Sequence, residues 1–346
     1  MRHLKHIRAP MDRSPMSASS QIVDRHGRNF NYLRLAVNEY CNLRCIYCMP
    51  EEGVPFRQKI QLLSTSEIKR LLSISAQIGV SKIRFTGGEP LLRKDIPELV
   101  DYVQNLSGVE SVQLTTNGVL LDQYINDLED SGLSGINISL DTLRSERFKA
   151  ITRRDGLDRV LGNIQLAIKS KIPSVKINVV AMRNLNHDEL LEFANLTLDH
   201  EITVRFIELM PFDSHQIWKT GKFYRAEHIV EELHSKIDQL QSVDGSSTEH
   251  YIFQMQKAKG KIAVIPAYSR NLCGACNRIR ITADGKLLNC LYSQEETNLR
   301  DAMRKGESDN KIKTMIQRTF LNKHVDGWAA QQHNEPHRES MTQIGG

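Results

Sequence analysis

KIRFTGGEPLLRKDIPELVDYVQNLSGVESVQLTT, residues 82–116, is predicted to form a strand, a helix and a second strand. Branched and aromatic side chains dominate residues 82–86, and two glycines follow them. Asp95 is then expected to cap a helix in which leucine and valine recur at helical spacing, and residues 111–115 are again strand-like. Because a helical crossover joins parallel neighbours, this unit predicts a parallel α/β sheet.

The same alternation extends to both sides of this unit. Ser64 and Glu67 form a capping box at the start of one predicted helix, and Gly79 follows that helix. The further predicted strands are 32–37, 135–140, 175–180 and 203–208, and the further predicted helices are 65–78, 122–130, 157–169 and 187–198. Strands that alternate with helices in this way indicate an α/β partial (β/α)6 barrel, whose chemistry gathers at the carboxyl ends of the strands.

The composition is that of an ordinary globular protein. Of the 346 residues, 40% are hydrophobic and 25% are charged, and the formal net charge is +5. No stretch offers the ~18 uncharged apolar residues that a membrane-spanning helix requires, so we expect no membrane span. The positive charge suits an anionic small molecule and is too small to predict binding to nucleic acid.

Three regions are expected along the chain. Residues 1–28 are basic and are predicted to form a poorly ordered extension. Residues 29–245 are predicted to form the partial barrel, and residues 246–346 a smaller strand-rich region. Within that last region, the polar stretch 309–339 is expected to be mobile.

A hairpin is predicted in the last region, because Asp284-Gly285 is a strong signal for a two-residue turn. Such a turn would lay Cys290 beside Ile279. Arg278 and Arg280 would share one face of the strand, since side chains alternate along it.

All six cysteines fall into two groups of three, Cys41, Cys45 and Cys48 in the first and Cys273, Cys276 and Cys290 in the second. The sequence shows no apolar secretory signal, so a disulfide scaffold is not indicated. Thiolates are the usual ligands of iron–sulfur clusters, and three of them on a four-iron cluster leave one iron open for a substrate or cofactor. Structural zinc, which normally takes four protein ligands, and ordinary buried thiols are the alternatives.

The first group has the sequence CNLRCIYC, which resembles the motif of the radical S-adenosylmethionine (SAM) superfamily. GGEP at 87–90 resembles the methionine-binding loop of that superfamily. Further stretches are similar to the GTP 3′,8-cyclase family of molybdenum cofactor biosynthesis, and the resemblance covers residues 31–346. They are YLRL at 32–35, KIRFT at 82–86, TTNG at 115–118, FIELM at 206–210, CGACNRIR at 273–280, Cys290 and the terminal Gly345-Gly346.

The resemblance implies a role for particular residues. Cys41, Cys45 and Cys48 would hold a [4Fe-4S] cluster that binds SAM, and Cys273, Cys276 and Cys290 would hold a second [4Fe-4S] cluster that faces the substrate. Tyr47, Gly88, Ser139 and Met210 would bind SAM. Arg34, Arg84, Thr115, Lys176, Arg278, Ile279 and Arg280 would bind GTP, which suits the bidentate pairing of arginine with phosphate. The first cysteine group, Arg278 and Arg280 are expected to be the catalytic residues.

The implied reaction is the radical cyclisation of GTP to (8S)-3′,8-cyclo-7,8-dihydroguanosine 5′-triphosphate, the first step of molybdenum cofactor biosynthesis. A 5′-deoxyadenosyl radical from SAM would abstract hydrogen from C3′ of the ribose. The resemblance also implies a cytoplasmic homodimer, an external electron donor and a downstream cyclic pyranopterin monophosphate synthase. The basic N-terminus leaves the mitochondrial matrix as an alternative location.

Two other functions fit parts of the sequence. Radical SAM maturases of peptides or sulfatases also use auxiliary clusters, but they usually carry more C-terminal cysteines than this chain has. A metal-binding module that recognises RNA would use zinc and a strongly basic or aromatic surface, whereas aromatic residues make up only 6% of this chain.

Overall fold

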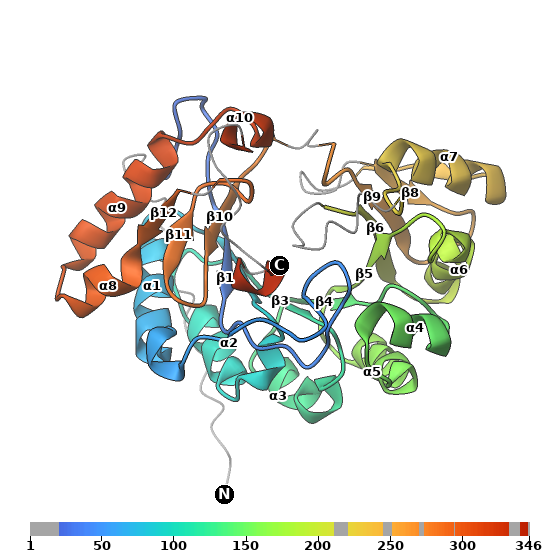
Figure 1. The fold of residues 1–346 in the computed structure, drawn as a ribbon, viewed down its shortest axis with the longest axis horizontal. Helices are drawn as coiled ribbons and strands as arrows, with labels where there is room; N and C mark the ends of the chain where they lie inside the picture. Colours follow the sequence, from blue (N-terminus) through green and yellow to red (C-terminus); the bar gives the residue numbers. More distant parts are fainter. Residues whose placement is uncertain are drawn as a thin grey trace, which may run out of the picture.

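The structure is a computed structural model, and it describes residues 21–210, 221–244, 251–269, 273–293, 295–331 and 340–344. The described residues form one twelve-stranded sheet in the order β12-β11-β10-β1-β2-β3-β4-β5-β6-β9-β8-β7. In Figure 1 this sheet curves around the centre of the molecule, and the helices lie on its outer side. In the described part of the chain, no helix combines the length and the apolar character needed to span a bilayer.

The predicted barrel strands are confirmed, and each is parallel to its neighbour. They are β1 (Tyr32–Ala36), β2 (Lys82–Thr86), β3 (Ser111–Thr116), β4 (Gly135–Ser139), β5 (Val175–Ala181) and β6 (Ile202–Glu208). The helices of this half are α1 (Thr65–Gln77), α2 (Ile96–Gln104), α3 (Ile125–Asp130), α4 (Ser145–Thr152), α5 (Leu157–Lys169), α6 (Leu190–Asp199) and α7 (Ala226–Lys236). Short 3-10 turns cover Lys59–Gln61, Pro90–Leu92, Leu121–Gln123 and His187–Glu189. The α/β partial barrel is therefore confirmed, while α4 and α7 were not predicted.

The helix starts follow local side-chain chemistry only in part. Ser64 and Glu67 form the predicted capping box of α1, each bonding the other's backbone amide. Asp95 precedes α2 as predicted, but its side chain makes no cap. Instead its carboxylate accepts hydrogen bonds from Arg93 Nε at 2.6 Å and from Thr65 Oγ1 at 2.5 Å, which ties the start of α2 to α1.

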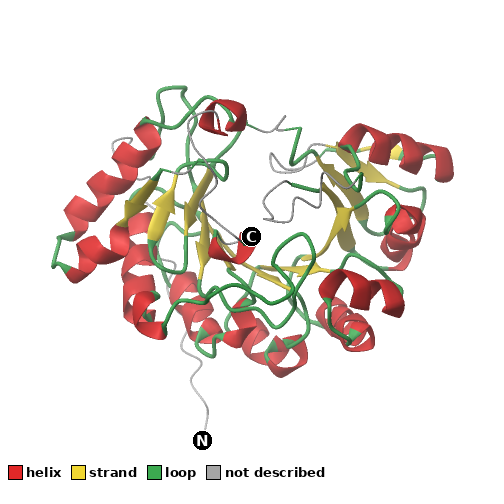
Figure 2. Ribbon diagram, in the orientation of Figure 1, coloured by secondary structure: helices red, strands yellow, loops and turns green. Residues whose placement is uncertain are grey.

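The C-terminal region does not form a sheet of its own, because it extends both edges of the barrel sheet. β9 pairs with β6 on one side, and β10 pairs with β1 on the other, both in parallel. Figure 2 shows these added strands at the two ends of the curved sheet. The elements are β7 (Gln241–Ser242), β8 (Tyr251–Gln254), β9 (Lys261–Ile265), β10 (Arg278–Ile281), β11 (Lys286–Leu288), β12 (Glu296–Asn298), α8 (Leu299–Arg304), α9 (Asp309–Leu321), α10 (Gly327–Gln331) and a 3-10 turn at Met341–Gln343.

The expectation of a mobile tail is wrong for the part of 309–339 that forms α9 and α10. Ser308 caps α9, and Ile312, Ile316 and Phe320 are buried on one face of that helix. The stretch is polar because only this single stripe faces the core. Residues 332–339 lie outside the described residues.

The predicted hairpin exists, but its turn is one residue longer than expected. The Thr282 amide donates to Lys286 O at 2.9 Å, and Arg280 pairs with Leu288. The loop is therefore 283–285, with Gly285 in the left-handed region at φ +78°. Continuing this register places Cys290 opposite Arg278 rather than Ile279. The difference arises because the Thr282 hydroxyl accepts the Lys286 amide and donates to Asp284, which stabilises the longer loop.

The described chain begins inside the expected extension and packs against the body of the molecule. Ile22 is buried, and Arg28 makes buried hydrogen bonds to the C-terminal region. Phe30 lies against Phe320 of α9, with ring centroids 4.6 Å apart. The structured part therefore starts before residue 29, while residues 1–20 lie outside the described residues.

Candidate functional site

One cavity of about 350 Å³ lies on the inner side of the curved sheet, and both cysteine groups line it. A volume of this order is within the ~300–1,000 Å³ that small-molecule sites occupy. The predicted site residues in its walls are Arg34, Cys41, Cys45, Tyr47, Cys48, Arg84, Gly88, Thr115, Ser139, Met210, Cys273, Cys276, Arg278, Arg280 and Cys290. The fold thus brings residues that are far apart in sequence together around one cavity.

Two predicted residues do not line this cavity. The Ile279 side chain is 2% exposed and packs in the hydrophobic core, so only its backbone is available to a ligand. Lys176 lies on β5, two positions before the cavity residue Asn178. The terminal Gly345-Gly346 lies outside the described residues.

The first cysteine group lies in the loop after β1, held by α4. The amides of Arg44 and Ile46 donate to Thr152 O and Ile151 O at 2.9 Å, at the end of that helix. Arg153 then donates to the backbone oxygen of Arg44 at 3.1 Å. The unpredicted helix is thus a support for the cysteine loop.

The glycine loop after β2 packs directly on the backbone that leads into the cysteines. A Cβ atom on Gly88 would meet Tyr40 O at 2.1 Å, and one on Gly87 would meet Asn38 O at 2.3 Å. Glycine is required here by close backbone approach. The fully buried Glu89 accepts hydrogen bonds from Thr116 Oγ1 and the Asn117 amide, each at 2.7 Å, and so joins this loop to the end of β3.

The three thiols of the first group suit an iron–sulfur cluster by their chemistry. Burial raises the pKa of Cys41 to about 11 and that of Cys48 to about 12, and it raises the pKa of Cys45 as well. Nearby sulfurs of the same group add to the shift for Cys45. Sulfurs so placed become thiolates when a metal centre supplies positive charge. In the described part of the chain, no three or more His, Cys, Asp or Glu side chains lie together as ligands of one single metal ion, so the fit to a cluster rests on the chemistry of the thiols.

Tyr47 is fixed at the wall of the cavity by a carboxylate that sequence reasoning did not identify. Its hydroxyl donates to Asp141 Oδ2 at 2.6 Å, and Asp141 Oδ1 accepts the Val180 amide at 2.8 Å. Burial raises the pKa of Asp141 to about 6. The pair joins the cysteine loop to the ends of β4 and β5.

The second cysteine group lies at the opposite end of the strands from the first. β10 runs parallel to β1, with Arg278 beside Tyr32, so Cys276 precedes the start of β10 while Cys41 follows the end of β1. A five-residue strand spans roughly 16 Å, which separates the two groups. The rule that barrel chemistry gathers at carboxyl ends therefore fits the first group only.

Two cations support the second group. Arg28 Nη1 donates to Cys273 O at 3.0 Å, and Lys323 donates to the oxygen of Asn289, which precedes Cys290. Burial would raise the pKa of Cys276, but the charges of Lys323 and Arg278 outweigh it and lower that pKa. A stabilised thiolate is the form that ligates iron.

Arginines line the cavity between the two groups. Burial, with repulsion from neighbouring guanidinium groups, lowers the pKa of Arg84 and of Arg280 to about 9, and it lowers that of Arg278. Arg205 of β6 faces the same cavity and donates to Asn137. So much buried positive charge predicts an anionic ligand.

A short C-terminal strap, residues 340–344, covers the first cysteine group. Ser340 Oγ donates to Cys48 O at 2.9 Å, and the Met341 amide donates to the same oxygen at 3.1 Å. Ser340, Thr342 and Ile344 are each 3% exposed or less. This end of the cavity is therefore closed by chain that lies almost 300 residues away in sequence.

Several cavity residues were not predicted from the sequence. Some of them lie at positions that a sequence pattern could have identified, and others do not. Asn178 and Arg205 lie on inward-facing strand positions and could have been found by period-two alternation. Lys323 and Met341 could not, because only tertiary packing brings them to the cavity.

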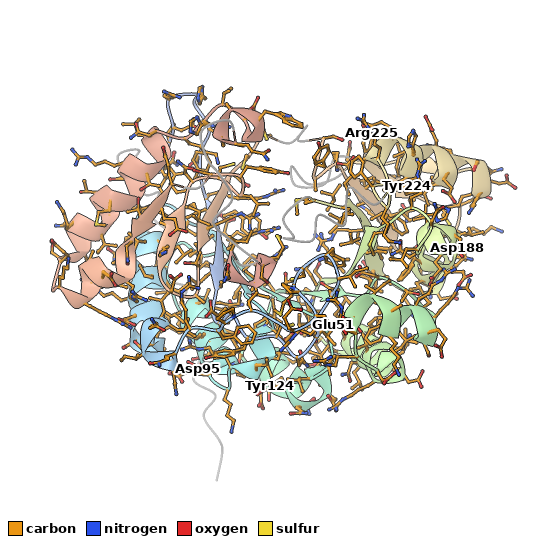
Figure 3. The ribbon with its side chains drawn as sticks, viewed as in Figure 1. Glu51, Asp95, Tyr124, Asp188, Tyr224 and Arg225 are labelled. Carbon is orange, nitrogen blue, oxygen red and sulfur yellow. The ribbon has the colours of Figure 1, made fainter. Side chains whose placement is uncertain are left out.

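A second hollow lies beside α7, away from the cysteines. Its residues include Arg183, His187, Tyr224 and Glu232. Figure 3 labels Tyr224 there, near the margin of the molecule. The Tyr224 hydroxyl donates to Glu232, which also forms an ion pair with Lys236 at 2.6 Å. These polar groups are therefore already partnered within the protein.

Comparison with protein families gives two matches in tandem. A family model described as "Radical SAM superfamily" matches residues 35–197, and one described as "Molybdenum Cofactor Synthesis C" matches residues 202–327. Among solved structures, SuiB of Streptococcus suis is similar with a TM-score of 0.63 and 17% identity, over 87% of this chain and 68% of that one. The SAM-bound form of SuiB gives a TM-score of 0.60. At this identity, the likeness establishes the shared fold.

Curated relatives match at much higher identity. The protein named GTP 3′,8-cyclase of Chlorobaculum tepidum is 43% identical over 325 residues, 94% of this chain and 97% of the relative. The GTP 3′,8-cyclase of Desulforamulus reducens is 40% identical over 94% of this chain and 100% of the relative. The human molybdenum cofactor biosynthesis protein 1 is 43% identical, and 47% of its length is covered. On these full-length matches, the chain belongs to the GTP 3′,8-cyclase family.

Proposed function

We propose that this protein is a GTP 3′,8-cyclase that converts GTP to (8S)-3′,8-cyclo-7,8-dihydroguanosine 5′-triphosphate. One observation carries the proposal. A single cavity has a cysteine triplet at each end and buried arginines between them. This arrangement matches a reaction that needs a radical source, an anionic nucleotide and a second anchor for that nucleotide.

The first triplet would hold the cluster that binds SAM, and the second would hold an auxiliary [4Fe-4S] cluster. The bound clusters and SAM supply one-electron chemistry, for which protein side chains alone are unsuited. Tyr47, held by Asp141, and Gly88, held against Tyr40, would shape the SAM end of the cavity. Ser139 and Met210 would complete that wall.

The arginines would bind the triphosphate. Burial and then the crowding of like charges lower their pKa values, and a polyanion would relieve that repulsion. Arg34, Arg84, Arg278 and Arg280 approach from three adjacent strands, so several phosphate oxygens could be held at once. Thr115 would add a contact from β3, whereas Lys176 of β5, which does not line the cavity, stays a prediction from the sequence. Fixing the nucleotide at several points would align its ribose with its base for ring closure.

The strap over the first triplet would exclude water and oxygen from the SAM end. Lys323 and Arg28 would hold the loops of the second triplet in place. Open iron at that end would face the guanine base, which is electron-rich and has nitrogen and oxygen donors.

Further properties of the family are proposed for this chain from resemblance alone. They are a cytoplasmic location, a homodimer, an external electron donor and a downstream cyclic pyranopterin monophosphate synthase. Size measurement in solution would test the dimer.

The decisive experiment uses the anaerobic, iron-reconstituted protein with SAM, a reductant and GTP deuterated at C3′. Mass spectrometry of the 5′-deoxyadenosine should show deuterium that depends on GTP. Arg278→Ala combined with Arg280→Ala should weaken GTP binding and leave the iron content unchanged, whereas the exposed Arg159→Ala serves as the control. Unlabelled 5′-deoxyadenosine from wild-type protein with both clusters present would eliminate C3′ of GTP as the target.

A further inference from the structure

Tyr32 is a buried polar side chain that the proposed mechanism does not yet use. It begins β1, between Arg278 on β10 and Lys82 on β2, and its side chain lines the cavity with 2% exposure. Within the described ranges, its hydroxyl has no hydrogen-bond partner. Because a buried hydroxyl without a partner is costly, its presence on a residue that lines the cavity indicates a missing ligand.

The ring of Tyr32 is surrounded by cations. Arg34 Cζ lies 5.7 Å from the ring centroid, Arg84 Cζ lies 5.3 Å from it, and Lys82 Nζ lies 5.2 Å from it. The negative face of an aromatic ring attracts such groups, and its rigid plane keeps them apart. The ring therefore supports two of the arginines expected to bind phosphate.

The same cations act on the hydroxyl. Burial alone would raise the pKa of Tyr32, but Arg84, Arg34, Lys82 and Arg278 outweigh it and lower the pKa to about 8. These groups face the phenol from β1, β2 and β10, the strands packed around it. A more acidic hydroxyl is a stronger hydrogen-bond donor, and its complement is a ligand with negatively charged oxygens.

We propose that Tyr32 is a further substrate-binding residue whose hydroxyl donates a hydrogen bond to a phosphate oxygen of the nucleoside triphosphate. Its ring acts at the same time as a positioning element for Arg34 and Arg84. This inference rests on the proposed function, because it requires a polyphosphate in the cavity. Tyr32 would thus have two roles: its hydroxyl binds the ligand, and its ring orders the arginines. Different substitutions can test each role separately.

The test is calorimetric binding to the anaerobic reconstituted full chain, with inorganic tripolyphosphate, GTP and guanosine as probes. Tyr32→Phe keeps the ring and should weaken tripolyphosphate and GTP about tenfold, as expected for one hydrogen bond to a charged group, while guanosine is unaffected. Tyr32→Leu removes the ring too and should weaken both further. Tyr102→Phe is the matched control, because Lys69 Nζ lies 5.2 Å from that ring outside the cavity.

A pH series distinguishes ligand contact from a structural role. Above about pH 8 the free phenol loses its proton, and it must regain that proton before it can donate. Wild-type affinity for tripolyphosphate should therefore fall more between about pH 7 and about pH 9, one unit on either side of the midpoint, than that of Tyr32→Phe.

The outcomes are distinct. Unchanged tripolyphosphate affinity in Tyr32→Phe would overturn the inference and leave the proposed function standing. A loss of guanosine binding instead would move the contact to the nucleoside and overturn the phosphate assignment. Wild-type protein that binds neither tripolyphosphate nor GTP would overturn both the inference and the proposed function.

Discussion

Replacing Arg28 with alanine should destabilise the segments that hold the second cysteine group in place. The side chain is 7% exposed and pairs at 2.7 Å with Asp24, whose carboxylate is fully buried. Its guanidinium also donates to Cys273 O at 3.0 Å, Val325 O at 2.7 Å and His324 O at 2.6 Å. One side chain thus joins the N-terminal segment, the cysteine loop and the segment after α9.

The magnitude follows from what remains after the substitution. Breaking a buried ion pair leaves the Asp24 carboxylate without its cation and with only the backbone amides of His26 and Arg28 as donors, which costs ~3–5 kcal/mol. The three carbonyls also lose a charged donor, but these losses overlap with the first and are not added. Since whole proteins are stable by only ~5–15 kcal/mol, a loss of about 4 kcal/mol is large.

The assay is denaturant unfolding of the anaerobic full chain followed by circular dichroism, together with iron per chain. Arg28→Ala should lower the unfolding midpoint and the iron content. Arg159→Ala, which breaks a surface pair with Asp122 at 3.0 Å, should cost ~0.5 kcal/mol or less. Arg28→Met with Asp24→Leu should recover part of the loss, because no charge is left buried. A loss below ~1 kcal/mol for Arg28→Ala, with normal iron, would refute the reasoning.

Three further changes test other parts of the site. Gly88→Ala should destabilise the protein by ~1–3 kcal/mol and abolish SAM binding in calorimetry, because the new methyl group would meet Tyr40 O at 2.1 Å. Cys290→Ser should lower iron to about half in a reconstituted sample, since one of the two proposed clusters would be lost, and full iron would contradict a second cluster. Ser340→Ala should speed oxygen-driven loss of iron about tenfold, with Ser340→Thr close to wild type, because the strap loses one of its two hydrogen bonds to Cys48 O and keeps only that of the Met341 amide.

The barrel could be predicted from the sequence because its signals are local. Buried parallel strands are short apolar runs, and α1 and α5 carry apolar residues at helical spacing between clear end signals. α4 was missed because only Phe148, Ile151 and Thr152 of its residues are buried, which is too little periodicity to detect. α9 was missed for the same reason, with polar residues on most of its surface.

Site residues that belong to sequence motifs could be predicted, whereas site residues whose role depends on tertiary packing could not. The cysteines, glycines and strand arginines can be identified from the sequence alone, and fifteen predicted residues line one cavity. Tyr32 was quoted only as part of the YLRL stretch and was given no role, and Arg28 fell within the expected poorly ordered extension. Nothing local distinguishes either, because their roles arise from β10 and from the segment after α9.

The position of β10 explains why the two cysteine groups face one another. If the C-terminal region formed a separate sheet, the position of its cysteines relative to the barrel would depend on how the two sheets pack together. Instead β10 adds to β1 in parallel, so the register of one strand pair fixes both groups at opposite ends of a shared wall. The antiparallel return of β11 then brings Cys290 back to the end where Cys276 lies. Tyr32, Arg34, Arg278 and Arg280 occupy the wall between, so the space between the two cysteine groups suits an anion. A substrate held there is in reach of both ends without any movement of domains, and this geometry is what a cyclisation within one nucleotide requires.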